Sequence, residues 1–174
     1  KLFHQFSKVH LEARTDELTG ISNRRDFLEK VKESLGRCSQ ENKPFSLIMF
    51  DLDDFKQIND TYGHAVGDEV LHIVSFALTK NLRANDLFAR WGGEEFLLAL
   101  CCTSDEQAAR LAEKLRQVVC EASYPQGMTV TASFGVAQSQ GTATFWELLE
   151  MVDKAMYLAK KRGKNCVVVH EGDV

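Results

Sequence analysis

The chain has 174 residues, of which 44% are hydrophobic, and a formal net charge of −4. This length suits one compact domain. The acidic balance argues against a general nucleic-acid surface, because a protein that tracks phosphates usually carries an excess of Lys and Arg. No apolar run approaches the ~20 residues of a membrane span, so we expect neither a nucleic acid nor a membrane as the partner of this fragment.

The five cysteines form no C-x-x-C pair. This argues against both a disulfide framework and a zinc knuckle. Reduced, buried thiols in the cytosol are the simplest interpretation, and we expect a cytoplasmic location.

The first thirteen residues carry an apolar stripe with a 4-3-4 spacing, at Leu2, Phe6, Val9 and Ala13. Such a stripe is typical of one face of a helix. We favour the end of a coiled coil that delivers a signal from an upstream sensor domain, and an ordinary N-terminal helix is the alternative. The expected division is a linker helix over 1–13 and one domain over 14–174.

Apolar periodicity predicts the elements of that domain. Helices are expected over 24–38, 64–82, 105–120 and 144–161, and strands over 45–50, 87–91, 96–100, 128–137 and 166–170. The pair Gly92 and Gly93 separates two of the strands and predicts a tight hairpin turn, because glycine accepts positive φ without strain. Hairpin strands with helices between them favour an α+β fold, a sheet with helices packed over it.

Three carboxylates, Asp51, Asp53 and Asp54, follow directly after an apolar strand. Carboxylates and backbone carbonyls are natural ligands for a hard cation such as Mg²⁺. If the hairpin lies beside this strand, Glu94 or Glu95 meets Asp51 at the end of the sheet, and one or two metal ions fit there. The alternative is an ordinary solvated acidic surface.

Basic residues surround Gly163 near the C-terminus: Lys160, Lys161, Arg162 and Lys164. They are able to bind a polyphosphate, or simply to interact with the dipole of their own helix end. The absence of side chains at Gly92 and Gly93 also lets a charged ligand approach the backbone. Composition and spacing thus indicate a metal and phosphate site and go no further.

Residues 90–96, with the sequence RWGGEEF, resemble the signature of the GGDEF family of diguanylate cyclases in its GGEEF form. Further family motifs follow in the family's order at 16–25, 50–56, 59–64, 67–68, 133–137, 155–160 and 163–165. The resemblance covers about residues 16–170. It implies an α+β fold with a central, mainly antiparallel five-stranded sheet wrapped by helices, similar to nucleotidyl cyclase and polymerase palm domains.

The resemblance also implies roles for individual residues. Asp51 and Glu94 are the expected catalytic and metal-binding carboxylates, with the Leu52 carbonyl as a further ligand for Mg²⁺, or Mn²⁺ as an alternative. Asn59 and Asp68 are the expected guanine readers. The other expected substrate-binding residues are Phe55, Lys56, Gly92, Gly93, Lys160 and Lys164.

Two positions depart from the family pattern. Lys164 stands where Arg is frequent, which keeps the charge but loses the bidentate fork. Asp54 replaces a frequent aromatic residue or His.

The function that the resemblance implies is the condensation of two GTP into cyclic di-GMP and two pyrophosphates, in a homodimer whose protomers each hold one GTP. A bacterial setting is implied, and the full-length protein is compatible with a membrane anchor upstream of this fragment. The alternative is a catalytically inactive receptor for GTP or cyclic di-GMP. Against it, the residues that such receptors usually lose are present here: Asp51, Asn59, Asp68, Glu94 and Lys160.

Arg83 and Asp86 form an R-x-x-D motif six residues before the Gly pair. Many family members carry an inhibitory product site at this place, so we expect cyclic di-GMP to bind there and to inhibit. The alternative is an exposed salt pair in a turn.

Overall fold

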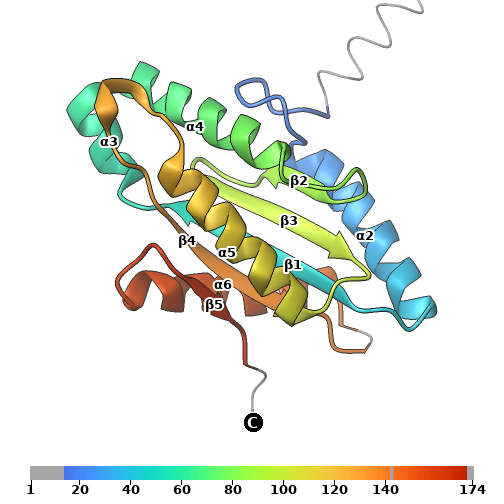
Figure 1. The fold of residues 1–174 in the computed structure, drawn as a ribbon. Helices are drawn as coiled ribbons and strands as arrows, with labels where there is room; N and C mark the ends of the chain where they lie inside the picture. Colours follow the sequence, from blue (N-terminus) through green and yellow to red (C-terminus); the bar gives the residue numbers. More distant parts are fainter. Residues whose placement is uncertain (1–13, 142, 172–174) are drawn as a thin grey trace, which may run out of the picture.

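A five-stranded sheet forms the centre of the computed structural model, which describes residues 14–141 and 143–171 (Figure 1). The strands run in the order β2-β3-β1-β4-β5, and neighbours are antiparallel except for β4 and β5, which are parallel. Their bounds are β1 Phe45–Leu52, β2 Leu87–Arg90, β3 Glu95–Cys101, β4 Ala132–Gln138 and β5 Val167–Val169. The prediction of a mainly antiparallel α+β sheet is therefore confirmed. The predicted linker helix over 1–13 lies outside the described residues.

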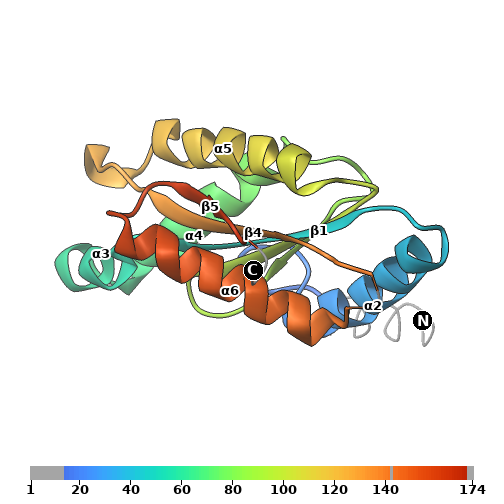
Figure 2. The ribbon, with the colours of Figure 1, turned by 90° about the horizontal axis from the view of Figure 1, so that it is seen from below.

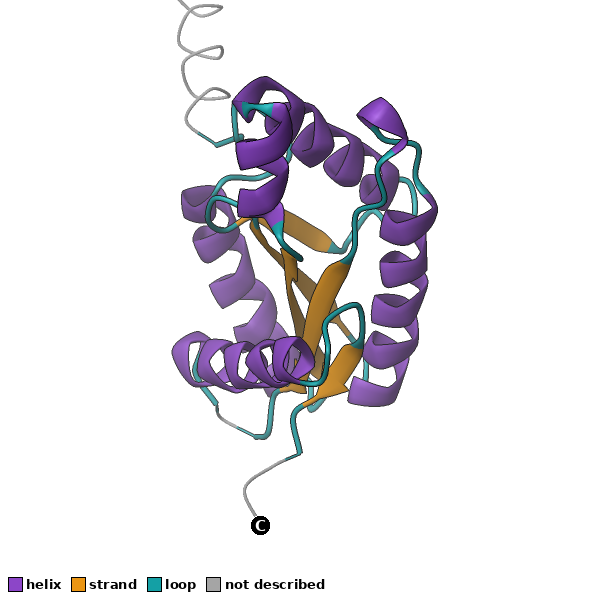
Figure 3. Cartoon of the chain, turned by 90° about the vertical axis from the view of Figure 1, so that its left-hand side faces the viewer, coloured by secondary structure: helices purple, strands orange, loops and turns teal. Residues whose placement is uncertain are grey.

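Helices cover both faces of this sheet (Figures 2 and 3). Their bounds are α2 Arg24–Gln40, α3 Phe55–Tyr62, α4 His64–Thr79, α5 Asp105–Glu121 and α6 Phe145–Lys161, with a short 3-10 turn, η1, at Pro125–Gly127. Side chains of β1 alternate between the faces. Ile48 and Phe50 pack with α4 and α5, whereas Leu47 and Met49 pack with α2 and α6.

Helix α3 was not predicted from the sequence. Its eight residues, FKQINDTY, are mostly polar, and Phe55 is its buried residue. So short a segment cannot show a repeated apolar stripe. The helix carries Asn59 and begins directly after the acidic end of β1.

Strand β4 begins at Ala132 and not at Met128, as the sequence had predicted. Its pairing with β1 ends at Leu52 opposite Ala132, because the chain then leaves the sheet for α3. The segment before β4 still touches this exit, since the Asp53 backbone N–H donates to the Thr131 carbonyl at 2.8 Å.

The hairpin between β2 and β3 is confirmed, but the predicted reason for its glycines is wrong. Neither Gly92 nor Gly93 has positive φ. A Cβ at Gly92 would lie 2.7 Å from Oε2 of Glu95, so the space beside Gly92 is occupied by the Glu95 side chain. A Cβ at Gly93 would meet nothing within 4 Å, which leaves the backbone open there.

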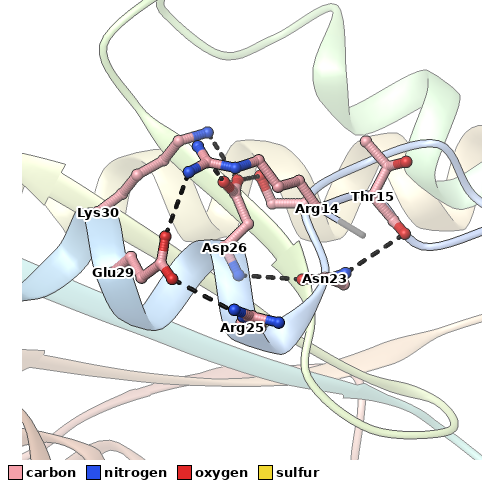
Figure 4. Close-up of polar contacts among 8 residues, drawn as sticks. Arg14, Thr15, Asn23, Arg25, Asp26, Glu29 and Lys30 are labelled. Carbon is pink, nitrogen blue, oxygen red and sulfur yellow. Dashed lines mark hydrogen bonds and ion pairs between the residues drawn. The ribbon is translucent and has the colours of Figure 1, made fainter. Parts of the chain in front are cut away.

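A buried carboxylate, that of Asp26, lies in the first turn of α2 (Figure 4). Asp26 is 2% exposed and accepts hydrogen bonds from Lys30 at 2.6 Å and from Ser22 at 2.7 Å, while its own N–H donates to Asn23, the N-cap. Burial alone would raise the pKa of Asp26, but the bonds from Lys30 and Ser22 and the nearby Arg14 lower it below the usual value. The charged form of Asp26 therefore stabilises the fold.

None of the described helices is both long enough and apolar enough to cross a lipid bilayer.

We expect Asp26→Asn to destabilise the protein at neutral pH by about 1–3 kcal/mol, because the bonds from Lys30 and Ser22 lose their ionised acceptor. A carboxylate with a lowered folded-state pKa contributes stability above its unfolded pKa and loses it as pH falls through the folded value. The gap between variant and wild type should therefore close in acid, in urea unfolding at several pH values. Glu29→Gln, at an exposed neighbour, is the control. A variant as stable as wild type at neutral pH contradicts this role.

Candidate active site

Asp51 occupies the end of β1 and faces α6. It lies opposite Glu95 on β3 and Ser133 on β4, and it is only 7% exposed. Lys160, in the last turn of α6, donates a hydrogen bond to Asp51 Oδ1. Burial raises the pKa of Asp51 to about 6; Lys160 acts in the opposite direction, and the charges of Glu94 and Glu95 add to the rise.

The two glutamates of the hairpin add negative charge near Asp51. The Leu52 N–H donates to the Glu94 carbonyl at 3.3 Å, so the turn is bonded to the end of β1. Burial and the negative charges of Asp153 and Glu94 raise the pKa of Glu95. Asp51 bonds to Lys160, Glu95 interacts with both Lys160 and Arg24, and Glu94 adds negative charge near both carboxylates. A divalent cation would relieve this concentration of negative charge.

The donor set suits Mg²⁺. Asp51 and Glu94 offer carboxylate oxygens and Leu52 a backbone carbonyl, and Mg²⁺ is usually held by one or two carboxylates together with substrate phosphates. Within residues 14–141 and 143–171, no three His, Cys, Asp or Glu side chains stand together as a preformed metal cage. An ion held here would therefore need further ligands, from water or from a bound ligand.

Arg90 fixes the hairpin turn, a role that the sequence analysis did not assign. Its Nε and Nη2 donate to the Gly93 carbonyl at 3.0 and 2.8 Å, and its Nη1 donates to Asp16 at 3.2 Å. Asp16 also accepts from the Thr19 hydroxyl at 2.7 Å. The opening loop and the GGEEF turn are therefore joined by one arginine. Arg90 and Asp16 both lie in the family motifs named above. They are far apart in the sequence, so no local spacing predicts their contact.

Asp53, one of three acidic candidates after β1, is engaged in hydrogen bonds that hold the fold. It is 5% exposed and accepts from the hydroxyls of Ser133 at 2.6 Å and Thr131 at 2.7 Å, and from the Asn165 N–H at 3.0 Å. Both carboxylate oxygens are engaged, which leaves Asp51 as the better metal ligand. Through Asn165, Asp53 holds the turn between Lys160 and β5 against the end of β1.

The two residues that depart from the family pattern contact each other. Lys164 Nζ donates to Asp54 Oδ1 at 2.6 Å, and this pair raises the pKa of Lys164. Asp54 has φ of 54° and Lys164 of 66°, both in the left-handed region. A phosphate at this place would compete with Asp54 for Lys164.

The expected guanine readers lie on neighbouring helices. Asn59 is on α3 and Asp68 on α4, which follow each other through Gly63. Asp68 is exposed, whereas Asn59 Oδ1 is buried and has no hydrogen-bond partner within the described residues. Phe55 is buried in the core, so only its backbone is available to a ligand, and Lys56 is exposed.

Arg83 and Asp86 lie apart from this site, beside a pocket of about 310 Å³ that Gln107 and Arg110 of α5 also line. The Arg83 N–H donates to Asp86 Oδ2 at 2.8 Å. In the described part of the chain Asp86 forms no ion pair with the Arg83 guanidinium, so the turn is closed through the backbone. The Arg83 side chain is exposed.

Comparison with known proteins defines the class of this sheet and its acidic end. The family model for "Diguanylate cyclase, GGDEF domain" matches residues 13–166. The chain therefore belongs to the GGDEF family of diguanylate cyclases, a class of nucleotidyltransferases, as its motifs predict.

Individual relatives agree with that assignment. Diguanylate cyclase DosC of Escherichia coli K12 is 36% identical over 171 residues, 96% of this chain and 37% of DosC. Response regulator PleD of Caulobacter vibrioides is 39% identical over 162 residues, 90% of this chain and 36% of PleD. The chain thus spans little more than a third of the length of these relatives.

Solved structures show the same fold. The coiled coil and GGDEF domain of DgcB from Caulobacter crescentus, in complex with c-di-GMP, has a TM-score of 0.90 at 26% identity, over 97% of this chain and 91% of that one. The active GGEEF domain of a diguanylate cyclase from Vibrio cholerae has a TM-score of 0.83 at 31% identity, over 87% of this chain and 98% of that one.

We expect Lys160→Met to raise the pKa of Asp51 above its value of about 6, because the substitution removes the cation that opposes burial. Carboxyl-carbon NMR titration of labelled protein measures this. Because its folded-state pKa is raised, Asp51 contributes its full share to the free energy of unfolding below its unfolded pKa. That contribution is lost as pH rises through about 6.

Lys161→Met is the matched control, because it removes a neighbouring lysine that does not bond to Asp51. The Lys161 ammonium group lies over the ring of Tyr157, 5.2 Å from its centroid. Equal Asp51 midpoints in the two variants would show that Lys160 does not neutralise Asp51.

Proposed function

We propose that this domain condenses two GTP into cyclic di-GMP and releases two pyrophosphates. The observation that carries the proposal is the acidic end of β1, where buried Asp51 bonds to Lys160 near the negative charges of Glu94 and Glu95. Membership of the family and the relatives named diguanylate cyclases support it.

One GTP binds with its guanine at α3 and α4 and its phosphates toward the turn after α6. The Asp68 carboxylate accepts hydrogen bonds from donors on the guanine edge, and the Asn59 carboxamide supplies one donor and one acceptor. Lys160 and Lys164, with Lys56, offer ammonium groups to the phosphates. A site built on such pairs discriminates strongly, because the wrong base leaves them unpaired.

Asp51, Glu94 and the Leu52 carbonyl hold Mg²⁺, with Mn²⁺ as an alternative. When bound, the metal supplies Lewis-acid activation of the 3′-hydroxyl and charge stabilisation at the α-phosphate. The protein residues do the remaining work. Lys160 and Lys164 neutralise the triphosphate, and Arg90 keeps the GGEEF turn in place through the Gly93 carbonyl.

In each half-reaction the 3′-oxygen of one GTP forms a bond to the α-phosphorus of the other. The bond from this phosphorus to its bridging oxygen breaks, pyrophosphate leaves, and the hydroxyl proton passes to a base, for which Glu94 is our assignment. Two such transfers close the ring. Because each protomer holds one GTP, a homodimer must bring the two into register. An upstream sensor domain that sets this register remains an expectation from the apolar stripe over 1–13.

We expect Glu94→Gln to reduce turnover by at least about 100-fold, since it removes a charged ligand from the reacting centre, while the fold stays intact. Incubation with GTP and Mg²⁺ followed by product chromatography measures turnover. Glu121→Gln, at the exposed end of α5, is the control. Undiminished cyclic di-GMP formation in Glu94→Gln would remove Glu94 from the mechanism. Wild-type protein that binds GTP and makes no product would favour the receptor alternative.

We also propose that cyclic di-GMP binds at Arg83 and Asp86 and inhibits the enzyme. The exposed Arg83 guanidinium beside the pocket of about 310 Å³ supports this, because an Arg fork pairs with a phosphate or with the Hoogsteen edge of guanine.

We expect Arg83→Ala to raise the cyclic di-GMP concentration for half-inhibition by about 10-fold or more, because a charged hydrogen bond is lost. Initial rates with added product measure this shift. Arg37→Ala, at an exposed arginine of α2, controls for loss of charge. Inhibition unchanged in Arg83→Ala would place the product elsewhere.

A further inference from the structure

Gly67 of α4 faces the Asn59 side chain of α3. Gly67 is a buried residue of α4. A Cβ built at Gly67 would lie 1.9 Å from Oδ1 of Asn59 and 3.0 Å from its Cγ. The first distance is far inside contact range, so the Asn59 carboxamide occupies the space that a side chain at Gly67 would need.

The cost of a glycine at this position makes that space informative. Glycine inside a helix is unfavourable relative to alanine, and φ of Gly67 is not positive, so backbone conformation does not demand it. Gly36 in α2 offers a contrast, because a Cβ there would meet nothing within 4 Å. A side chain at position 67 would therefore have to displace the Asn59 carboxamide, which glycine leaves in place.

The Asn59 carboxamide in this space lacks one of its hydrogen bonds. Asn59 Oδ1 is buried and has no hydrogen-bond partner within the described residues, although a buried acceptor normally has one. Phe55 also borders the space at Gly67, since its Cζ lies 3.2 Å from the same built Cβ. The Asn59 carboxamide thus fills the space that Gly67 leaves, and its buried oxygen still lacks a hydrogen-bond donor within the described residues.

We propose that Gly67 is a positioning residue for base recognition: its missing side chain fixes the orientation in which the Asn59 carboxamide meets guanine. This inference rests on the proposed role of Asn59 in GTP binding. A carboxamide presents a donor and an acceptor in a fixed plane, so displacing it breaks the match with the guanine edge and leaves the phosphate contacts intact.

A double-mutant cycle tests the proposal. Dissociation constants for a non-hydrolysable GTP analogue and for inorganic tripolyphosphate are measured by calorimetry with Mg²⁺ on wild type, Gly67→Ala, Asn59→Ala and the double variant. We expect Gly67→Ala to weaken binding of the GTP analogue about 10-fold, because a buried hydrogen bond is lost, and to leave the affinity for tripolyphosphate unchanged. In the Asn59→Ala background, Gly67→Ala should cause no further loss. Gly36→Ala is the matched control and should bind like wild type.

Three results overturn the proposal. Wild-type affinity in Gly67→Ala shows that the space is not needed. Equal loss for tripolyphosphate, or further loss in the Asn59→Ala background, shows damage that does not pass through Asn59. If Asn59→Ala itself binds the analogue normally, the guanine-reading part of the proposed function fails, whereas normal binding by Gly67→Ala alone refutes only the positioning role.

Discussion

The Asp51 carboxylate requires a neighbouring cation, because it lies one residue before the end of β1, a strand that is buried along its whole length. A buried charge is costly unless it is paired, and the raised pKa of Asp51, about 6, expresses this cost. Lys160 neutralises this carboxylate in the described structure, and a divalent ion neutralises it in the proposed reaction. One constraint thus links a structural ion pair to the proposed reaction.

Neighbouring elements keep this carboxylate and its partners in place. Asp53 uses its own oxygens to hold Ser133 and the turn that follows Lys160. Arg90 does the same for the GGEEF turn through Gly93. Such supporting contacts matter because a catalytic group misplaced by about 1 Å loses much of its effect.

Most of the fold was predictable from the sequence, whereas the supporting contacts were not. Strands such as β1 are apolar runs, and α6 repeats its apolar residues over seventeen positions, so both give strong local signals. Helix α3 gives none, because it is short and polar. The site residues were predicted from the family motifs. The hydrogen bonds of Asp53 join it to residues 78, 80 and 112 positions away, and Asp54 and Lys164 are 110 positions apart. No local pattern encodes contacts of this kind.

The central claim is that the end of β1 accepts a divalent ion beside a bound guanine nucleotide. Crystals grown with a non-hydrolysable GTP analogue and Mn²⁺, with data collected at the manganese edge, test it most directly. The account predicts an anomalous peak bound by Asp51 and Glu94, with Lys160 turned from Asp51 to the phosphates. A map with nucleotide present, no anomalous peak at Asp51, and Lys160 still bonded to that carboxylate would contradict it.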